Sequence, residues 1–223
     1  MNKMALNKKA INKFKREILS MAHEFQFECE YLNKYLEDSI SMLKKETDLK
    51  ADAKLYSVEA DNYFWSVQHT HYFSCSFIIM LMQISETLST QYFGHAKNIF
   101  GDSYGYRKEQ RISHYNSVDN YLERKFGLQI KSKWWKQLAI VYQIRNVIVH
   151  DNGAVDPHKK LMFTNICREY KGFDIVDNQL KIELTFCRDA LKIFRKALSA
   201  FFLESKDNLN LLKKHSDTLC GHA

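Results

Sequence analysis

The sequence predicts an all-α fold, a bundle of long antiparallel helices with a minor β-hairpin. The first 93 residues contain no glycine or proline and are rich in Leu, Met, Lys and Glu, which favour helices. Apolar residues in this region recur at the spacing of a helix. Strict alternation, which indicates strands, is confined to a short stretch after Phe173.

Two long helices are expected in the N-terminal half. The first carries an apolar stripe that fits either one long helix or a gently broken pair: Ile11, Phe14, Ile18, Phe25, Leu32, Leu36 and Leu43. Residues 45–60 are polar and are expected to connect it to a second helix, from an N-cap at Asp61 to about Phe93. The middle of the second helix is apolar on every side, which is typical of a helix at the centre of a bundle.

Shorter elements are expected after these helices. Residues 94–116 contain glycines and little periodicity, so we expect a long loop. A short helix is expected over about 117–126, and another from after Ser132 to near His150. An Asn-Gly pair and then the chain's only proline follow this last helix and give its stop signal.

The C-terminal region predicts a hairpin and a final helix. Residues 173–184 alternate around Asp177-Asn178, which predicts the two strands and their turn. The final helix has an amphipathic stripe: Leu191, Phe194, Leu198 and Phe201. The length predicts one domain, with an N-terminal helical extension (1–50), a core (61–205) and a flexible tail (206–223).

Composition limits the function classes. The formal net charge of +7 and the pI of about 9.0 fit an anionic partner such as nucleic acid, and equally a plain basic bias. The longest apolar run, residues 77–82, is far shorter than the roughly 18 residues that a membrane span requires. The N-terminus lacks the apolar core of a secretory signal. We therefore expect a cytoplasmic protein without a membrane partner.

No metal or cofactor site is expected. The five cysteines are widely spaced and form no Cys-x-x-Cys pair, so neither a disulfide framework nor a thiolate zinc site is indicated. His69 and His71 would share one face of a strand, but they lie about 200° apart on a helix. We therefore reject them as metal ligands.

Residues 145–150, Arg-Asn-Val-Ile-Val-His, carry the strongest indication of chemistry. Arg145 is a permanent planar cation that can hold a phosphate with two parallel hydrogen bonds. Asn146 adds an amide that donates and accepts, and histidine at position 150 is the side chain type that exchanges protons near neutrality. At a helix end, such a set could bind and cleave a phosphodiester without metal.

Spacing alone also fits a plainer interpretation, in which Arg145 pairs with a carboxylate and His150 only ends a helix. The two residues lie about 140° apart on a straight helix and cannot share one face. Their cooperation therefore requires either a backbone turn near His150 or partners from two subunits.

The motif and its context resemble the HEPN superfamily of all-helical proteins. The residues that carry the resemblance are Trp135, Leu138, Ile144, Arg145, Asn146, His150 and Gly153, and it covers about residues 70–205. The hallmark of the family is an Arg followed four to six residues later by a His, often with Asn directly after the Arg. The resemblance implies a metal-independent endoribonuclease that works as a homodimer, with two motifs facing across a cleft.

The resemblance also implies residue roles. His150 would deprotonate the 2′-OH or protonate the leaving 5′-oxygen, Arg145 would hold the scissile phosphate, and Asn146 would orient the phosphate or the imidazole. The expected products are a 2′,3′-cyclic phosphate and a 5′-hydroxyl. Glu86 is expected to reach Arg145 or orient His150, or else to form a buried salt bridge without a catalytic role.

One branch of the family does not fit. HEPN toxins paired with nucleotidyltransferase antitoxins carry a Tyr two residues after the His, where it accepts a nucleotide. This chain has Asn152 at that place, which argues against that form of control.

RNA contacts are expected from the 94–116 segment, which interleaves cations with aromatic rings: Lys97, Tyr104, Tyr106, Arg107, Lys108 and Arg111. Cations suit backbone phosphates and rings suit unstacked bases, although a plain surface loop fits as well. The first functional hypothesis is therefore an endoribonuclease, with a toxin or phage-defence role and a cognate antitoxin or regulatory partner that only the resemblance implies. The alternative is a non-catalytic HEPN-like module for dimerisation or for binding RNA or nucleotides.

Overall fold

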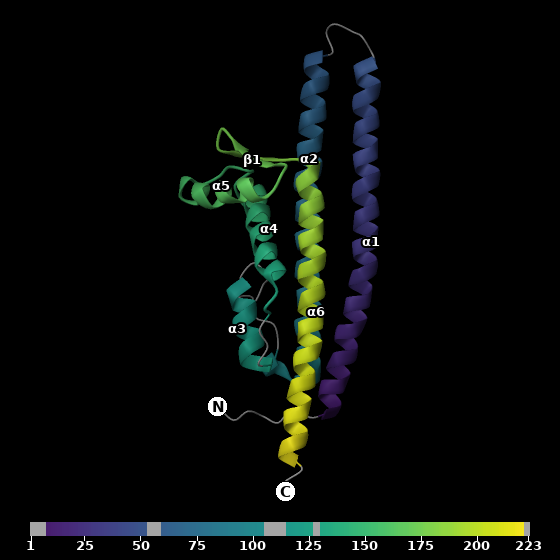
Figure 1. The fold of residues 1–223 in the computed structure, drawn as a ribbon, viewed down its shortest axis with the longest axis vertical. Helices are drawn as coiled ribbons and strands as arrows, with labels where there is room; N and C mark the ends of the chain where they lie inside the picture. The colour runs from purple at the N-terminus through teal and green to yellow at the C-terminus, as the bar shows by residue number, and fades with distance from the viewer. Residues whose placement is uncertain (1–7, 53–58, 105–114, 127–129, 221–223) are drawn as a thin grey trace. The chain divides into compact units, whose positions relative to one another are not determined.

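The chain is mainly helical, with one small sheet. A computed structural model describes residues 8–52, 59–104, 115–126 and 130–220. The elements, in chain order, are α1 (Lys8–Asp52), α2 (Glu59–Phe100), the 3-10 turn η1 (Asp102–Tyr104), α3 (Tyr115–Phe126), α4 (Lys133–His150), the 3-10 turn η4 (Pro157–Lys159), α5 (Lys160–Glu169), β1 (Phe173–Val176), β2 (Gln179–Ile182) and α6 (Leu184–Cys220) (Figure 1). The prediction of an all-α fold with a minor hairpin is confirmed.

Two compact units make up the chain. The first contains Met1–Phe27, Gln83–Tyr142 and Ile193–Ala223, and the second contains Glu28–Met82 and Gln143–Lys192. Each of the four long helices contributes a segment to both units. The division into an extension, a core and a tail stays a prediction.

Aromatic packing holds the first unit together. Phe14 of α1 is fully buried, and its ring centroid lies 5.1 Å from that of Tyr92 and 5.6 Å from that of Phe126. Trp135 of α4 stacks on Phe201 of α6 with the centroids 5.3 Å apart. Such pairs add about 0.5–1.5 kcal/mol each beyond the area that they bury, so this cluster fixes how the segments of the first unit meet.

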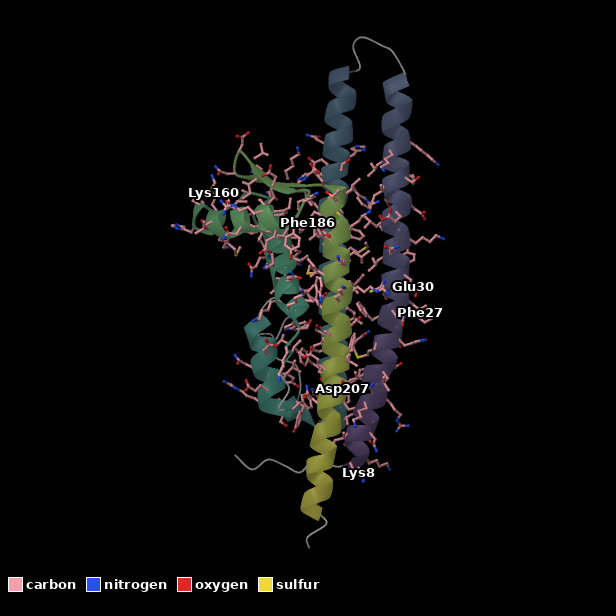
Figure 2. The ribbon with its side chains drawn as sticks, in the orientation of Figure 1. Lys8, Phe27, Glu30, Lys160, Phe186 and Asp207 are labelled. Carbon is pink, nitrogen blue, oxygen red and sulfur yellow. The ribbon has the colours of Figure 1, made fainter. Side chains whose placement is uncertain are left out.

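The second unit has its own, smaller core. Phe186, at the start of α6, is fully buried, and Phe173 of β1 lies 5.1 Å from it between ring centroids. Phe163 of α5 is also fully buried, and its centroid lies 6.3 Å from that of Phe173. These rings attach α5 and the hairpin to the beginning of α6, and Figure 2 labels Phe186 at this point.

The hairpin follows directly from its turn residues. Asp177 and Asn178 have φ of 50° and 61°, as a two-residue turn of type I′ requires, and β1 pairs antiparallel with β2 from Val176↔Gln179 outward. On the outer edge of β1, the amide of Ile175 donates to the carboxylate of Asp174 at 2.8 Å. The predicted strands and turn are confirmed.

Helix boundaries in the N-terminal half were predicted too short. The expected connection over 45–60 is wrong at both ends, because α1 continues to Asp52 and α2 begins at Glu59. The predicted loop over 94–116 is wrong for its first part, since α2 continues to Phe100 and η1 follows it. Gly94 costs a helix about 1 kcal/mol, but the burial of Tyr92, Phe93 and Ala96 outweighs that cost.

Two features of the C-terminal half were not predicted. Helix α5 was missed because Pro157 was interpreted only as a stop signal, whereas it also opens a new helical segment with Asp156 as its cap. Helix α6 continues to Cys220, past the point near Ser205 where fraying was expected. The reason lies in packing, because Ser205 and Leu209 are both fully buried.

Candidate functional site at the end of helix α4

The Arg-Asn…His motif lies on the last turns of α4, in the second unit. Ile144 is fully buried and Val147 is 2% exposed, and they anchor this part of the helix. Arg145 and Asn146 are half-buried, whereas His150, the last residue of α4, is exposed. The motif therefore combines a sheltered cation with an accessible imidazole.

Helix α4 ends in the turn that the sequence predicted. The amides of Asp151 and Gly153 both donate to the carbonyl of Val147, at 3.1 and 2.9 Å. Asn152 and Gly153 adopt φ of 49° and 81°, a left-handed conformation that Asn tolerates and Gly favours. The reversal begins only after His150, so His150 itself keeps the helical backbone.

The segment after the turn pairs with the hairpin. The amide of Leu180 in β2 donates to the carbonyl of Gly153 at 2.9 Å, and the amide of Val155 donates to the carbonyl of Asn178 at 2.8 Å. Residues 153–155 thus extend along the outer edge of β2, with an isolated bridge between Ala154 and Gln179. No local pattern in the sequence indicates this attachment, which fixes the helix end that carries His150.

His71 of α2 completes the same edge of β2. Its Nδ1 accepts a hydrogen bond from the amide of Ile182 at 3.3 Å, and its Nε2 lies 3.5 Å from Sγ of Cys75. Burial lowers the pKa of His71 below its ordinary value, and a protonated Nδ1 could no longer accept from the amide. Burial also raises the pKa of the Cys75 thiol to about 11, so this pair is a structural contact rather than an activated nucleophile.

Within the motif, Asn146 contacts the cation beside it. Nη1 of Arg145 donates to Oδ1 of Asn146 at 3.1 Å. Sequence reasoning placed Asn146 on the phosphate or the imidazole, and the contact with the guanidinium was missed. Asn146 can therefore orient the guanidinium fork on which bidentate phosphate binding depends.

Arg145 and His150 lie on one unbroken helix. At 100° per residue they diverge by about 140°. The backbone turn that could have brought them together within one chain is therefore not present between them. Cooperation between two subunits, the other route that the sequence left open, stays a prediction.

Glu86 lies on the segment of α2 that belongs to the first unit. It is half-buried, and its Oε1 accepts a hydrogen bond from the hydroxyl of Tyr142 at 2.9 Å. Tyr142 was not among the expected partners. The expected contacts of Glu86 with Arg145 or His150 stay predictions.

The expected RNA-binding residues are described only in part. Lys97 forms an ion pair with Asp102 at 3.2 Å on the surface. The ring of Tyr104 packs against Phe126 at a centroid distance of 5.3 Å, with the ammonium group of Lys125 5.5 Å from its centroid. Tyr106, Arg107, Lys108 and Arg111 lie outside the described residues. RNA binding by this segment stays a prediction.

Among the described residues, no group of three metal-ligating side chains occurs, and no helix is long and apolar enough to cross a membrane. No protein-family model matches the sequence, and no curated protein and no solved structure shows a significant similarity to it.

Proposed function

We propose that the chain is a metal-independent endoribonuclease of HEPN type that acts as a homodimer, with Arg145 of one copy and His150 of the other completing each site. One observation carries this proposal: Arg145 and His150 diverge on a helix that stays unbroken through both. A two-fold axis beside the end of α4 would bring the arginine of one copy to the histidine of the other.

The chemistry needs little beyond these groups, because the RNA ribose supplies its own nucleophile. An exposed His150 takes the proton of the 2′-OH, whose oxygen then attacks the phosphorus. The bond from phosphorus to the 5′-oxygen breaks, and that oxygen receives a proton from an imidazolium. Arg145, oriented by Asn146, holds the phosphate and the charge that develops on it.

Exposed apolar side chains of the second unit, which also carries the motif, support a partner for this unit. Val149 is 40% exposed on the last turn of α4, and Leu161 and Met162 of α5 are 75% and 40% exposed. Val176, at the end of β1, is 48% exposed. The hairpin turn is joined to α5 by Lys160, whose ammonium group donates to Asn178 at 3.0 Å and which Figure 2 labels. The proposal requires these side chains to form one contiguous apolar surface, which is typical of a surface that a partner covers.

Mixing two inactive variants tests the composite site. Arg145→Ala and His150→Ala are each expected to abolish cleavage of a mixed RNA pool. In a mixed dimer, one site regains both side chains, so random exchange of subunits should restore about a quarter of the wild-type activity. If each subunit were self-contained, the mixture would stay inactive.

A matched control uses the double variant Arg145→Ala/His150→Ala. Purified as a heterodimer with a wild-type chain, it leaves no site with both side chains if sites are composite. A self-contained wild-type subunit would instead keep its own activity. Half of the wild-type activity in this heterodimer would overturn the composite site. If neither this heterodimer nor the mixture of single variants is active, mass measurement must show that the mixed dimers have formed.

Chelation separates this proposal from metal-dependent cleavage and from a binding module. Cleavage should survive excess EDTA and give 2′,3′-cyclic phosphate ends. Binding of RNA without any cleavage would favour the non-catalytic module. The toxin or defence role rests on the resemblance alone, and it predicts that induced expression of the wild type arrests cell growth while His150→Ala at equal protein level does not.

A further inference from the structure

Helix α1 carries a second, exposed row of side chains besides its buried stripe. Its members follow one another at spacings of three and four residues, the repeat by which helices pair with helices. All six are exposed, and we name them the outer face of α1: Glu28, Tyr31, Tyr35, Asp38, Met42 and Lys45.

This outer face lies well away from the buried stripe of the same helix. In the second unit, the buried side chains of α1 up to Lys45 are Cys29, Leu32, Leu36 and Ile40. At 100° per residue, the centre of the outer face is about 130° around the helix from the centre of that stripe. Tyr31 and Met42 are 66% and 64% exposed, so two large apolar side chains of this row are open to solvent. Tyr35 is 41% exposed, with its ring centroid 6.0 Å from that of Phe73 in α2.

We propose that the outer face of α1 binds the outer face of α1 in a second copy of this chain, with the two helices antiparallel. Such a pairing places Glu28 opposite Lys45, Tyr31 opposite Met42, and Tyr35 opposite Asp38. Each pair occurs twice about the two-fold axis. The layers join opposite charges, two apolar groups, and a phenol that can donate to a carboxylate.

Charge complementarity selects both the partner and the direction. A parallel pairing in the same register would set Glu28, Asp38 and Lys45 each against its own copy and would repel at all three layers. The antiparallel pairing has no such conflict. Polar residues at the facing positions of paired helices lower stability but fix register and orientation, and these three charges do so only for the antiparallel pair.

This contact is separate from the pairing proposed at the end of α4. It uses another helix and none of the residues assigned to catalysis. If both contacts form, the protein assembles into species larger than a dimer. A failure of the α1 contact would appear in the assembly state, whereas a failure of the proposed function would appear in the cleavage of RNA.

Charge reversal tests the contact directly. Sedimentation velocity over a concentration series measures the dissociation constant of this contact. The contact appears as a monomer-to-dimer step, or as a dimer-to-tetramer step if the copies already pair through α4. Lys45→Glu or Glu28→Lys alone replaces two attractive pairs with two repulsive ones and should raise the dissociation constant about tenfold. The double variant Glu28→Lys/Lys45→Glu restores opposite charges in both pairs and should return the constant to the wild-type range.

Matched controls make the same changes of charge on another side of α1. Glu30 and Lys44 are exposed, and at 100° per residue they lie off the outer face. Figure 2 labels Glu30 on α1. Glu30→Lys and Lys44→Glu should leave the dissociation constant unchanged. Circular dichroism on every variant checks that the helices are retained.

Cross-linking reports the direction of the helices. Chains with Tyr31→Cys and chains with Met42→Cys should form a disulfide across the two faces when mixed under mild oxidation, and neither should do so alone. The unaltered chain under the same oxidation shows any background from its native cysteines. Self-linking of each single variant would indicate a parallel pair and overturn the proposal. The proposal is also overturned if the wild type does not self-associate, or if the double reversal fails to restore association. Either result is expected if another protein or RNA, rather than a second copy, binds this face.

Discussion

Trp135 and His150 lie near the two ends of one helix, α4, and they serve opposite purposes. Trp135 is 1% exposed, stacks on Phe201, and donates from its indole nitrogen to Asp119 at 3.1 Å. His150 is exposed, and backbone hydrogen bonds to the carbonyl of Val147 hold the turn that follows it. The burial of Trp135 fixes one end of the helix, whereas the side chain of His150 at the other end stays available for chemistry.

The largest expected effect is at the Trp135 end. Trp135→Ala removes a buried ring and leaves a cavity, so it should lower the free energy of unfolding by about 4 kcal/mol in urea titrations. The neighbouring Trp134 is a matched control because it is only half-buried, under the ammonium groups of Lys133 and Lys196. Trp134→Ala should cost about 1 kcal/mol. Equal losses at the two positions would show that the stacked ring does not anchor the helix.

At the His150 end, stability and activity should separate. His150→Ala should change the free energy of unfolding by less than about 0.5 kcal/mol, since an exposed side chain contributes little packing. Cleavage of RNA should fall by about a hundredfold or more if the imidazole moves the proton. The comparison between the two ends breaks down if His150→Ala unfolds the chain, or if it cleaves RNA at the wild-type rate.

The hairpin that holds the His150 end should be sensitive at Gly172. Its φ is 74°, and a Cβ there would collide with the Thr185 hydroxyl and approach the amide of Phe186 to 3.0 Å. Gly172→Ala should therefore lower the free energy of unfolding by about 2 kcal/mol. Gly94→Ala is the opposite control, because nothing lies within 4 Å of a Cβ there and alanine should stabilise the helix interior by about 0.5–1 kcal/mol. A stabilising Gly172→Ala would contradict this account of the hairpin.

The smallest effect concerns His71 and depends on pH. Because burial lowers the pKa of His71 from its ordinary value of 6.5, the unfolded chain binds this proton more readily than the folded chain. The contribution of His71 is therefore complete above pH 6.5 and is lost as the pH falls through the folded-state pKa. His71→Ala should cost about 1 kcal/mol at pH 7.5, and less in acid.

His71→Asn is the informative companion of that variant, since its amide oxygen can still accept from Ile182 but does not titrate. The difference in unfolding free energy between the wild type and His71→Asn should shift against the wild type as the pH falls from 7.5 to 5. A difference that does not vary with pH would show that the imidazole of His71 is not the titrating group. The contributions of carboxylates elsewhere to the free energy of unfolding fall in acid equally in both proteins, so they cancel in this comparison.

The sequence predicted the elements that local chemistry determines. The end of α4 near His150 and the turn at Asp177-Asn178 both follow from residues that tolerate a left-handed backbone, and both are confirmed. The apolar stripe of α1 could likewise be predicted from spacing alone. Each of these depends on a few neighbouring residues, so a short window of sequence contains the information.

Contacts between distant segments could not be predicted in this way. The attachment of Gly153 to Leu180 and the bond from Ile182 to His71 join residues that no local pattern relates. The continuation of α2 past Gly94 depends on burial that the glycine itself does not reveal. Arg145, Asn146 and His150 could be named from the sequence, but the structure was required to show that the helix stays unbroken between them.

A two-stranded sheet has two open edges, and each is a template on which another chain can add a strand and begin to aggregate. In this hairpin, outward-facing amides on both edges are bonded within the chain. Residues 153–155 and the imidazole of His71 cover the edge of β2, and the carboxylate of Asp174 holds the amide of Ile175 on the edge of β1. Protonation of His71 would remove the acceptor of the Ile182 amide, and removal of Asp174 would remove that of the Ile175 amide. Each change would therefore leave one more donor on a strand edge to which another chain can bind.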